Sequence, residues 1–195
     1  PEDGNVSRGK YSCPDCGQKY SIVDRIQERG DFDSRLYAVE YFCQQCKEDG
    51  RDKSEVKGYK AADDRDFRLF EEAEAKWEQS ENLHRYVPDT EIPLGIMTDS
   101  TAFEGSIGGG HNLLRHGYTE WTDMFNERQL LCLSKLLKSI LEIEDQNVRE
   151  YLILTFSDCL KTNTLMASYS YTGGKISDIF STNSFDTPQE PLETN

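Results

Sequence analysis

The chain has 195 residues, of which 36% are hydrophobic and 30% are charged, and its formal net charge is -14. This composition favours a protein with much exposed surface, or a segment whose contact face is covered by the rest of a longer chain. It excludes a surface that attracts nucleic acid everywhere, and no apolar run reaches the roughly 20 residues that cross a bilayer. The start has no signal-peptide pattern, so we expect a cytoplasmic location.

Residues 1–58 are predicted to form a small β-rich module. Aromatic and β-branched residues, which are typical of strands, occur around Tyr11 and in residues 20–23 and 36–42. A turn is predicted at residues 28–31. Two Cys-x-x-Cys pairs lie in the module, and they are 26 residues apart.

The cysteine pairs predict a zinc ribbon. Two thiolates three positions apart on a tight turn can both reach one ion, and a second such turn completes the tetrahedron that zinc prefers. Gly17 follows the first pair and leaves the backbone free to turn. Four protein ligands leave no open position, so the zinc is expected to be structural. The predicted ligands are Cys13, Cys16, Cys43 and Cys46.

Two other interpretations of the cysteines are weaker. A disulfide framework needs an oxidising compartment, which the missing signal peptide disfavours. A thioredoxin-like redox motif does not need a second copy. The two remaining cysteines, Cys132 and Cys159, fall on apolar helix faces and are predicted to be small buried residues rather than ligands.

Residues 59–87 are predicted to form an acidic amphipathic helix. Phe67, Phe70, Ala73 and Trp77 recur at helical spacing, and the helix should end before Pro88. Residues 88–125 are predicted to be an irregular connection rich in glycine. Long connections of this kind are usually functional or mobile.

Residues 126–195 are predicted to form a helical pair with an extended polar tail. The first helix is expected at residues 127–143, with Asn126 as its N-cap. The second, at residues 146–167, carries an apolar stripe wide enough to need covering from more than one side. The fold class predicted for the chain is therefore α+β.

No catalytic constellation is evident in the sequence. The glycine-containing segment at residues 103–110 follows no apolar strand and opens no clear helix, so a linker is favoured over a nucleotide-binding loop. The histidines, His84, His111 and His116, lack the spacing of a metal motif. No segment resembles the elbow that presents a nucleophile.

The later part of the chain resembles a known family. The resemblance is carried by residues 91–95 and 116–131, which include Phe125-Asn126-Glu127-Arg128-Gln129-Leu130-Leu131. It continues in residues 156–158, Asn163, 179–180, Pro188 and 193–195. This stretch is similar to one found inside large prokaryotic adenine-specific DNA methyltransferases, where it follows a zinc-ribbon-like cysteine region and a glycine-containing loop. Because the chain also starts without an initiator methionine, we expect a piece of a longer protein.

The resemblance implies a parent enzyme that transfers a methyl group from S-adenosylmethionine to an amino nitrogen of adenine in DNA. Such enzymes hold the flipped base with an Asp- or Asn-Pro-Pro-aromatic motif. No two prolines are adjacent in this chain, and no clear Phe-x-Gly-x-Gly cofactor motif is present. The missing pair of motifs is a decisive departure from the family pattern. The resemblance therefore implies a non-catalytic insert of a methyltransferase.

The insert could read DNA, clamp it or stiffen the scaffold. Residues 1–58 carry 10 basic and 12 acidic side chains, so they are the least acidic part of the chain, and Tyr37 or Tyr41 could stack on bases. The expected partners are the remainder of the methyltransferase chain and duplex DNA. A free-standing zinc-binding adaptor that docks onto proteins is the alternative. The candidate DNA contacts are Arg25, Arg29, Arg35, Lys47, Arg51, Lys53 and Lys57.

Overall fold

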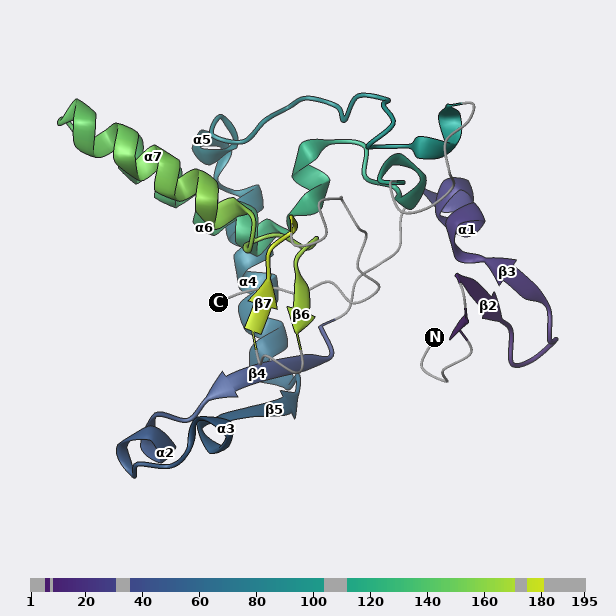
Figure 1. The fold of residues 1–195 in the computed structure, drawn as a ribbon, viewed down its shortest axis with the longest axis horizontal. Helices are drawn as coiled ribbons and strands as arrows, with labels where there is room; N and C mark the ends of the chain where they lie inside the picture. Colours follow the sequence, from purple (N-terminus) through teal and green to yellow (C-terminus); the bar gives the residue numbers. More distant parts are fainter. Residues whose placement is uncertain (1–5, 8, 31–35, 104–111, 171–174, 181–195) are drawn as a thin grey trace.

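The structure is a computed structural model that describes residues 6–7, 9–30, 36–103, 112–170 and 175–180. Within these ranges the fold is α+β, as predicted, and its strands form three small antiparallel sheets (Figure 1). None of the helices described there has the length and apolar character needed to cross a membrane.

The first sheet contains β1 (Val6–Ser7), β2 (Lys10–Ser12) and β3 (Lys19–Ser21), in that order. Helix α1 (Ile22–Arg29) follows β3 directly, so the prediction of a strand through residue 23 is wrong at its end. The hydroxyl of Ser21 accepts the N–H of Asp24 at 3.3 Å, which caps the new helix. The predicted turn at residues 28–31 begins where Gly30, with φ of 93°, ends α1.

The second sheet pairs β4 (Ala38–Phe42) with β5 (Lys57–Ala61). The predicted strand at residues 36–42 is confirmed in β4. Two short helices, α2 (Gln44–Glu48) and α3 (Lys53–Val56), fill the connection between the strands. Figure 1 shows this sheet at the lower edge of the molecule, with α2 and α3 at its outer end.

The predicted acidic helix is divided into α4 (Asp64–Glu78) and α5 (Glu81–His84). The break occurs beside Ser80, whose hydroxyl donates to the carbonyl of Lys76 at 2.6 Å. The change of direction places Leu83 against Ala73 and Leu131, and these three buried side chains form one core cluster. Helices α4 and α5 thereby pack on α6.

The connection at residues 88–125 is irregular, as predicted, but it also supplies most of the main core. Its regular turns are the 3-10 helices η1 (Ser100–Ala102), η2 (Leu114–His116) and η3 (Trp121–Met124). Leu113 has no exposed surface and packs with Ile92, Met124 and Met166. The glycine-containing segment considered as a cofactor loop lies mostly in residues 104–111, outside the described residues.

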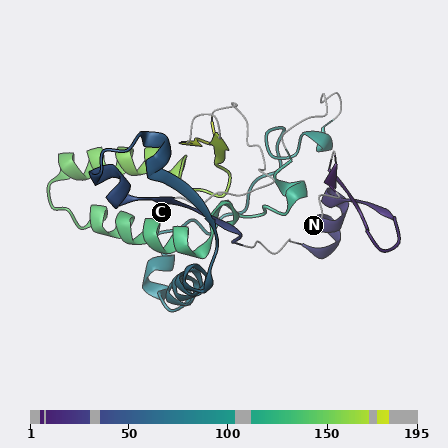
Figure 2. The ribbon, with the colours of Figure 1, turned by 90° about the horizontal axis from the view of Figure 1, so that it is seen from below.

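Helices α6 (Glu127–Leu141) and α7 (Gln146–Leu160) form an antiparallel pair (Figure 2). The predicted N-cap is confirmed: Asn126 Oδ1 accepts the N–H of Gln129 at 2.9 Å, and Gln129 Oε1 accepts the N–H of Asn126 at 3.1 Å. Helix α7 ends earlier than predicted, and none of its residues is fully buried.

A short hairpin follows the helical pair. Strands β6 (Ser168–Ser170) and β7 (Lys175–Ser177) pair in antiparallel register. Residues 175–177 of the predicted tail are extended in β7, and their pairing with β6 was not predicted. The remainder of the predicted tail, residues 181–195, lies outside the described residues.

Candidate functional site

The first cysteine pair lies on the turn between β2 and β3. The N–H of Cys13 donates to the carbonyl of Gln18 at 2.9 Å, and the N–H of Gly17 donates to the carbonyl of Cys13 at 2.9 Å. Gly17 has φ of 70°, which favours glycine after the second cysteine. The backbone N–H groups of Cys16 and Asp15 lower the pKa of the Cys13 thiol, because they stabilise its thiolate.

The second cysteine pair lies where β4 meets α2. Cys43 is the N-cap of α2, and its Sγ accepts the N–H of Cys46 at 3.2 Å. The N–H of Cys43 donates to the carbonyl of Val56 at 2.7 Å, which ties the turn to the start of β5. The pKa of the Cys43 thiol is lowered, first by its hydrogen bond with the Cys46 thiol and then by the backbone N–H of Cys46.

Each turn places two thiols where they could bind one metal ion, but the two turns are far apart in the fold. Figures 1 and 2 place the β2–β3 hairpin and helix α2 at opposite ends of the molecule. Over the described ranges, no three side chains of the His, Cys, Asp or Glu type gather in a group that could hold a metal ion. The four-cysteine zinc site therefore stays a prediction.

The other two cysteines, Cys132 and Cys159, are less buried than the sequence predicted. Cys132 is exposed on α6, so the prediction that it is buried is wrong. Cys159 is half-buried near the end of α7. The buried positions of α6 are Gln129, Leu131, Ser134 and Ile140, so Cys132 lies off the buried face of this helix.

The candidate DNA-contacting residues divide between the two ends of the molecule. On α1, Arg25 pairs with Glu28 and stacks on the ring of Tyr20 at 4.4 Å, and Arg29 lies in the last turn. Near the second sheet, Lys57 lies 2.5 Å from Glu40 and Lys47 lies 5.6 Å from the ring centre of Phe42.

Of the three remaining members of that set, the structure fully describes only Arg51. Arg51 is exposed after α2, and its N–H donates to the carbonyl of Cys46 at 3.0 Å. Arg35 and the side chain of Lys53 lie outside the described residues. The members of the set that the structure describes are therefore not gathered into one basic surface.

The two described histidines, His84 and His116, contact neighbouring residues of the fold. The ring of His84 lies against the ring of Trp77 at a tilt of 47°, with centroids 4.3 Å apart, and its Nε2 lies 3.0 Å from the carbonyl oxygen of Trp77. His116 is half-buried, and burial together with Arg115 lowers its pKa. His111 lies outside the described residues.

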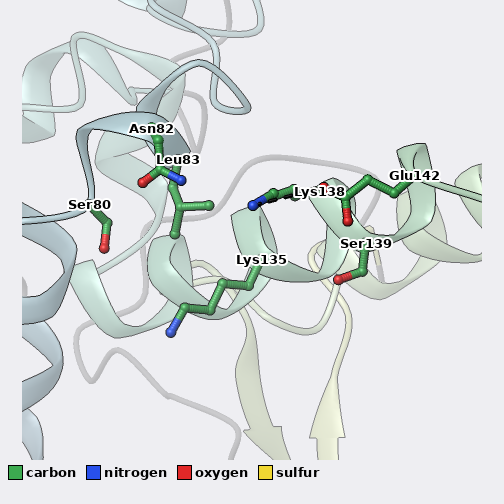
Figure 3. Close-up of a pocket in the computed structure, with 7 residues that line it drawn as sticks. All are labelled: Ser80, Asn82, Leu83, Lys135, Lys138, Ser139 and Glu142. Carbon is green, nitrogen blue, oxygen red and sulfur yellow. Dashed lines mark ion pairs between the residues drawn. The ribbon is translucent and has the colours of Figure 1, made fainter.

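Figure 3 shows a pocket between α5 and α6 that is lined mainly by polar side chains. The ammonium groups of Lys135 and Lys138 border it, and Lys138 Nζ lies 3.8 Å from a carboxylate oxygen of Glu142. No nucleophile is paired with a base in this lining. The lining residues are Ser80, Asn82, Leu83, Lys135, Lys138, Ser139 and Glu142.

One polar contact that sequence reasoning missed joins two sheets. The hydroxyls of Tyr59 on β5 and Tyr169 on β6 are hydrogen-bonded, and their rings meet edge to face. The Tyr59 hydroxyl and the Glu40 carboxylate raise the pKa of Tyr169. The two tyrosines are 110 positions apart, so no local pattern could have revealed the contact.

Comparisons of this chain with known protein families, with curated proteins and with solved structures found no match.

Proposed function

We propose that this chain is a zinc-binding, non-catalytic insert of an adenine-specific DNA methyltransferase. The parent would transfer a methyl group from S-adenosylmethionine to the amino nitrogen of adenine in DNA. The observation that carries the zinc part is the pair of Cys-x-x-Cys turns, each with a backbone N–H directed at a thiol. The methyltransferase part rests on the sequence resemblance around residues 116–131.

Zinc would be held by Cys13, Cys16, Cys43 and Cys46, and it would act as a crosslink between the two turns. The donor set fits, because four thiolates are a preferred ligand set for structural zinc. The ion would require the two turns to approach each other. Residues 31–35, which lie between the two cysteine-bearing sheets, are outside the described residues.

The module that bears the cysteines needs such a crosslink. Among the described residues before Ala62, only Ile26 and Val56 are buried hydrophobic side chains. A module of this size with so little buried apolar surface does not reach a stable fold through its core alone. A metal bond supplies folding free energy that the apolar residues do not.

The chemical step would belong to the rest of the parent enzyme. The chain contains no Pro-Pro pair, which the base-binding motif of these enzymes requires. The role of this chain would be to support the scaffold or to contact the target DNA. Arg25, Lys47 and Arg51 are described basic residues that could neutralise phosphates.

Elemental analysis of the purified chain tests the zinc proposal. We expect one zinc ion per chain, and we expect the double variant Cys13→Ser, Cys43→Ser to lose it. Cys132→Ser is the matched control, because Cys132 is exposed and lies outside both turns. Purified chain without stoichiometric metal, or a double variant that retains it, would refute the proposal.

A methylation assay tests the role in the parent. The product of the complete gene is incubated with duplex DNA and labelled S-adenosylmethionine, and label is expected on adenine. The 195-residue chain is expected to bind no S-adenosylmethionine in calorimetry. Absence of methyl transfer by the complete product, or tight cofactor binding by this chain, would contradict the assignment.

A second candidate function is a zinc-binding adaptor that docks onto other proteins, and helix α7 favours it. Val148, Tyr151 and Leu154 recur along this helix and are 48%, 77% and 69% exposed. Exposed apolar side chains at helical spacing are suited to a protein interface. Binding of duplex DNA that weakens steeply with salt would favour the methyltransferase insert, and its absence would favour the adaptor.

A further inference from the structure

Each Cys-x-x-Cys turn brings its own two thiols into contact. The thiols of Cys13 and Cys16 share a hydrogen bond on the turn between β2 and β3. The thiols of Cys43 and Cys46 share another where β4 meets α2. Within the described ranges, neither pair belongs to a group of three or more potential metal ligands. The structure therefore groups these four cysteines as two separate dithiols.

The backbone holds each turn without a contribution from the other turn. The first turn is closed by the two backbone hydrogen bonds described above. In the second turn, the N–H of Lys47 donates to the carbonyl of Cys43 at 3.2 Å, and the N–H of Arg51 donates to the carbonyl of Cys46 at 3.0 Å. Because these bonds lie within or beside a single turn, they keep its two thiols together in the absence of a metal bond.

The four thiols are accessible to a small oxidant. Cys16 is exposed, and the other three cysteines are half-buried. A peroxide converts an accessible thiolate to a sulfenic acid, which condenses with a neighbouring thiol to give a disulfide. In each turn the neighbouring thiol is the other member of the same pair.

We propose that each turn is a redox-active dithiol that a peroxide closes into its own disulfide, and that closure of both turns releases the zinc ion. One thiolate attacks a peroxide oxygen and becomes a sulfenic acid, and the hydroxide that leaves takes up a proton. The second thiolate attacks the sulfenic sulfur and displaces another hydroxide, which is also protonated. The two sulfurs lose two electrons, and the peroxide gains them as it becomes two water molecules.

Closure of both disulfides removes the ligands that zinc needs. Zinc binds the thiolate form of cysteine, and a disulfide sulfur carries no such charge. Two peroxides and four protons thus convert the four zinc-bound thiolates into two disulfides, four water molecules and a free zinc ion. Each turn keeps its backbone bonds, whereas the crosslink between the turns is lost. The release of zinc rests on the proposed function, while the pairing of the thiols does not.

The test treats the zinc-loaded 195-residue chain with hydrogen peroxide. A chromogenic chelator measures released zinc, and mass spectrometry of tryptic peptides identifies the disulfides. The tryptic peptides 11–19 and 36–47 each contain one whole pair. A disulfide within a turn removes the mass of two hydrogens from one peptide, whereas a disulfide between the turns joins the two peptides. We expect both within-turn disulfides to form as one zinc ion per chain is released, and dithiothreitol to restore zinc binding.

Two variants serve as controls. Cys132→Ser should release zinc as the unchanged chain does, because Cys132 is exposed but lies outside both turns. Cys46→Ser removes the partner of Cys43, so Cys43 should end as a sulfinic acid while the first turn still forms its disulfide. A disulfide between the two peptides, oxidation of the unchanged turns without a disulfide, or zinc that stays bound after both disulfides have formed would overturn the inference.

The zinc content of the reduced chain distinguishes this inference from the proposed function. If the reduced chain binds zinc but peroxide does not close the two turns separately, the redox inference fails alone. If the reduced chain binds no zinc, the proposed function fails and the release of zinc fails with it. The peptide masses then still decide whether each turn is a dithiol that closes on itself.

Discussion

Replacement of Leu113 by alanine tests whether the irregular segment really carries the main core. Leu113 is fully buried and packs against Ile92, Met124 and Met166. Truncation removes buried methyl groups and leaves a cavity, which together cost about 3–5 kcal/mol of the free energy of unfolding. For a chain of this size each kcal/mol shifts the melting temperature by about 2–4 °C, so a decrease of roughly 6–20 °C is expected.

Urea unfolding followed by circular dichroism gives the free energy, and a thermal scan gives the midpoint. Leu154→Ala serves as the control, because Leu154 is 69% exposed on α7 and its truncation should change the free energy by no more than about 0.5 kcal/mol. A loss below about 1 kcal/mol in Leu113→Ala would show that residues 88–125 do not form the packing described above.

Three further predictions concern the metal, a helix cap and an acidic group. If the zinc proposal is correct, chelation with EDTA should speed amide hydrogen exchange in residues 9–30 and 36–61 while residues 112–170 keep their protection. Asn126→Ala removes the cap of α6 and should cost about 1 kcal/mol in urea unfolding, whereas Asn82→Ala, outside the cap, should be nearly neutral. Hydrogen bonding from Lys60, followed by backbone N–H groups, lowers the pKa of Asp63 from 3.8 to about 2. Its contribution to stability is therefore complete above pH 3.8 and is lost as the pH falls through about 2, and Asp63→Asn should remove this part of the acid-unfolding curve.

The parts of the fold that sequence patterns predicted best are those with local causes. Asn126 and Gln129 stand three positions apart before an apolar stripe, which is the pattern of a capping box, and α6 begins there. Ile22 and Val23 were wrongly predicted to be in a strand, because a short apolar run is compatible with a strand and with a helix equally. Ser21 and Asp24 carried the signal that would have decided for the helix.

The parts that could not be predicted depend on contacts between distant residues. Leu113 lies in a segment without periodicity, so nothing local marks it as the most buried leucine of the described chain. Tyr59 meets Tyr169 only because two sheets approach each other. The cysteine spacing predicts two turns from local geometry, but whether the turns meet depends on the segment between them.

The distribution of buried apolar surface explains why a metal would be placed at one end of this chain only. Residues 92–167 contain Leu113, Met124, Leu131 and Ile140, which are buried and stabilise that part without help. The cysteine-bearing part has Ile26 and Val56 and exposes aromatic rings. Because those exposed rings form no core, the module needs a stabilising bond that does not consume apolar surface. A thiolate-bound ion satisfies that requirement, which is why the zinc proposal falls on this end of the chain.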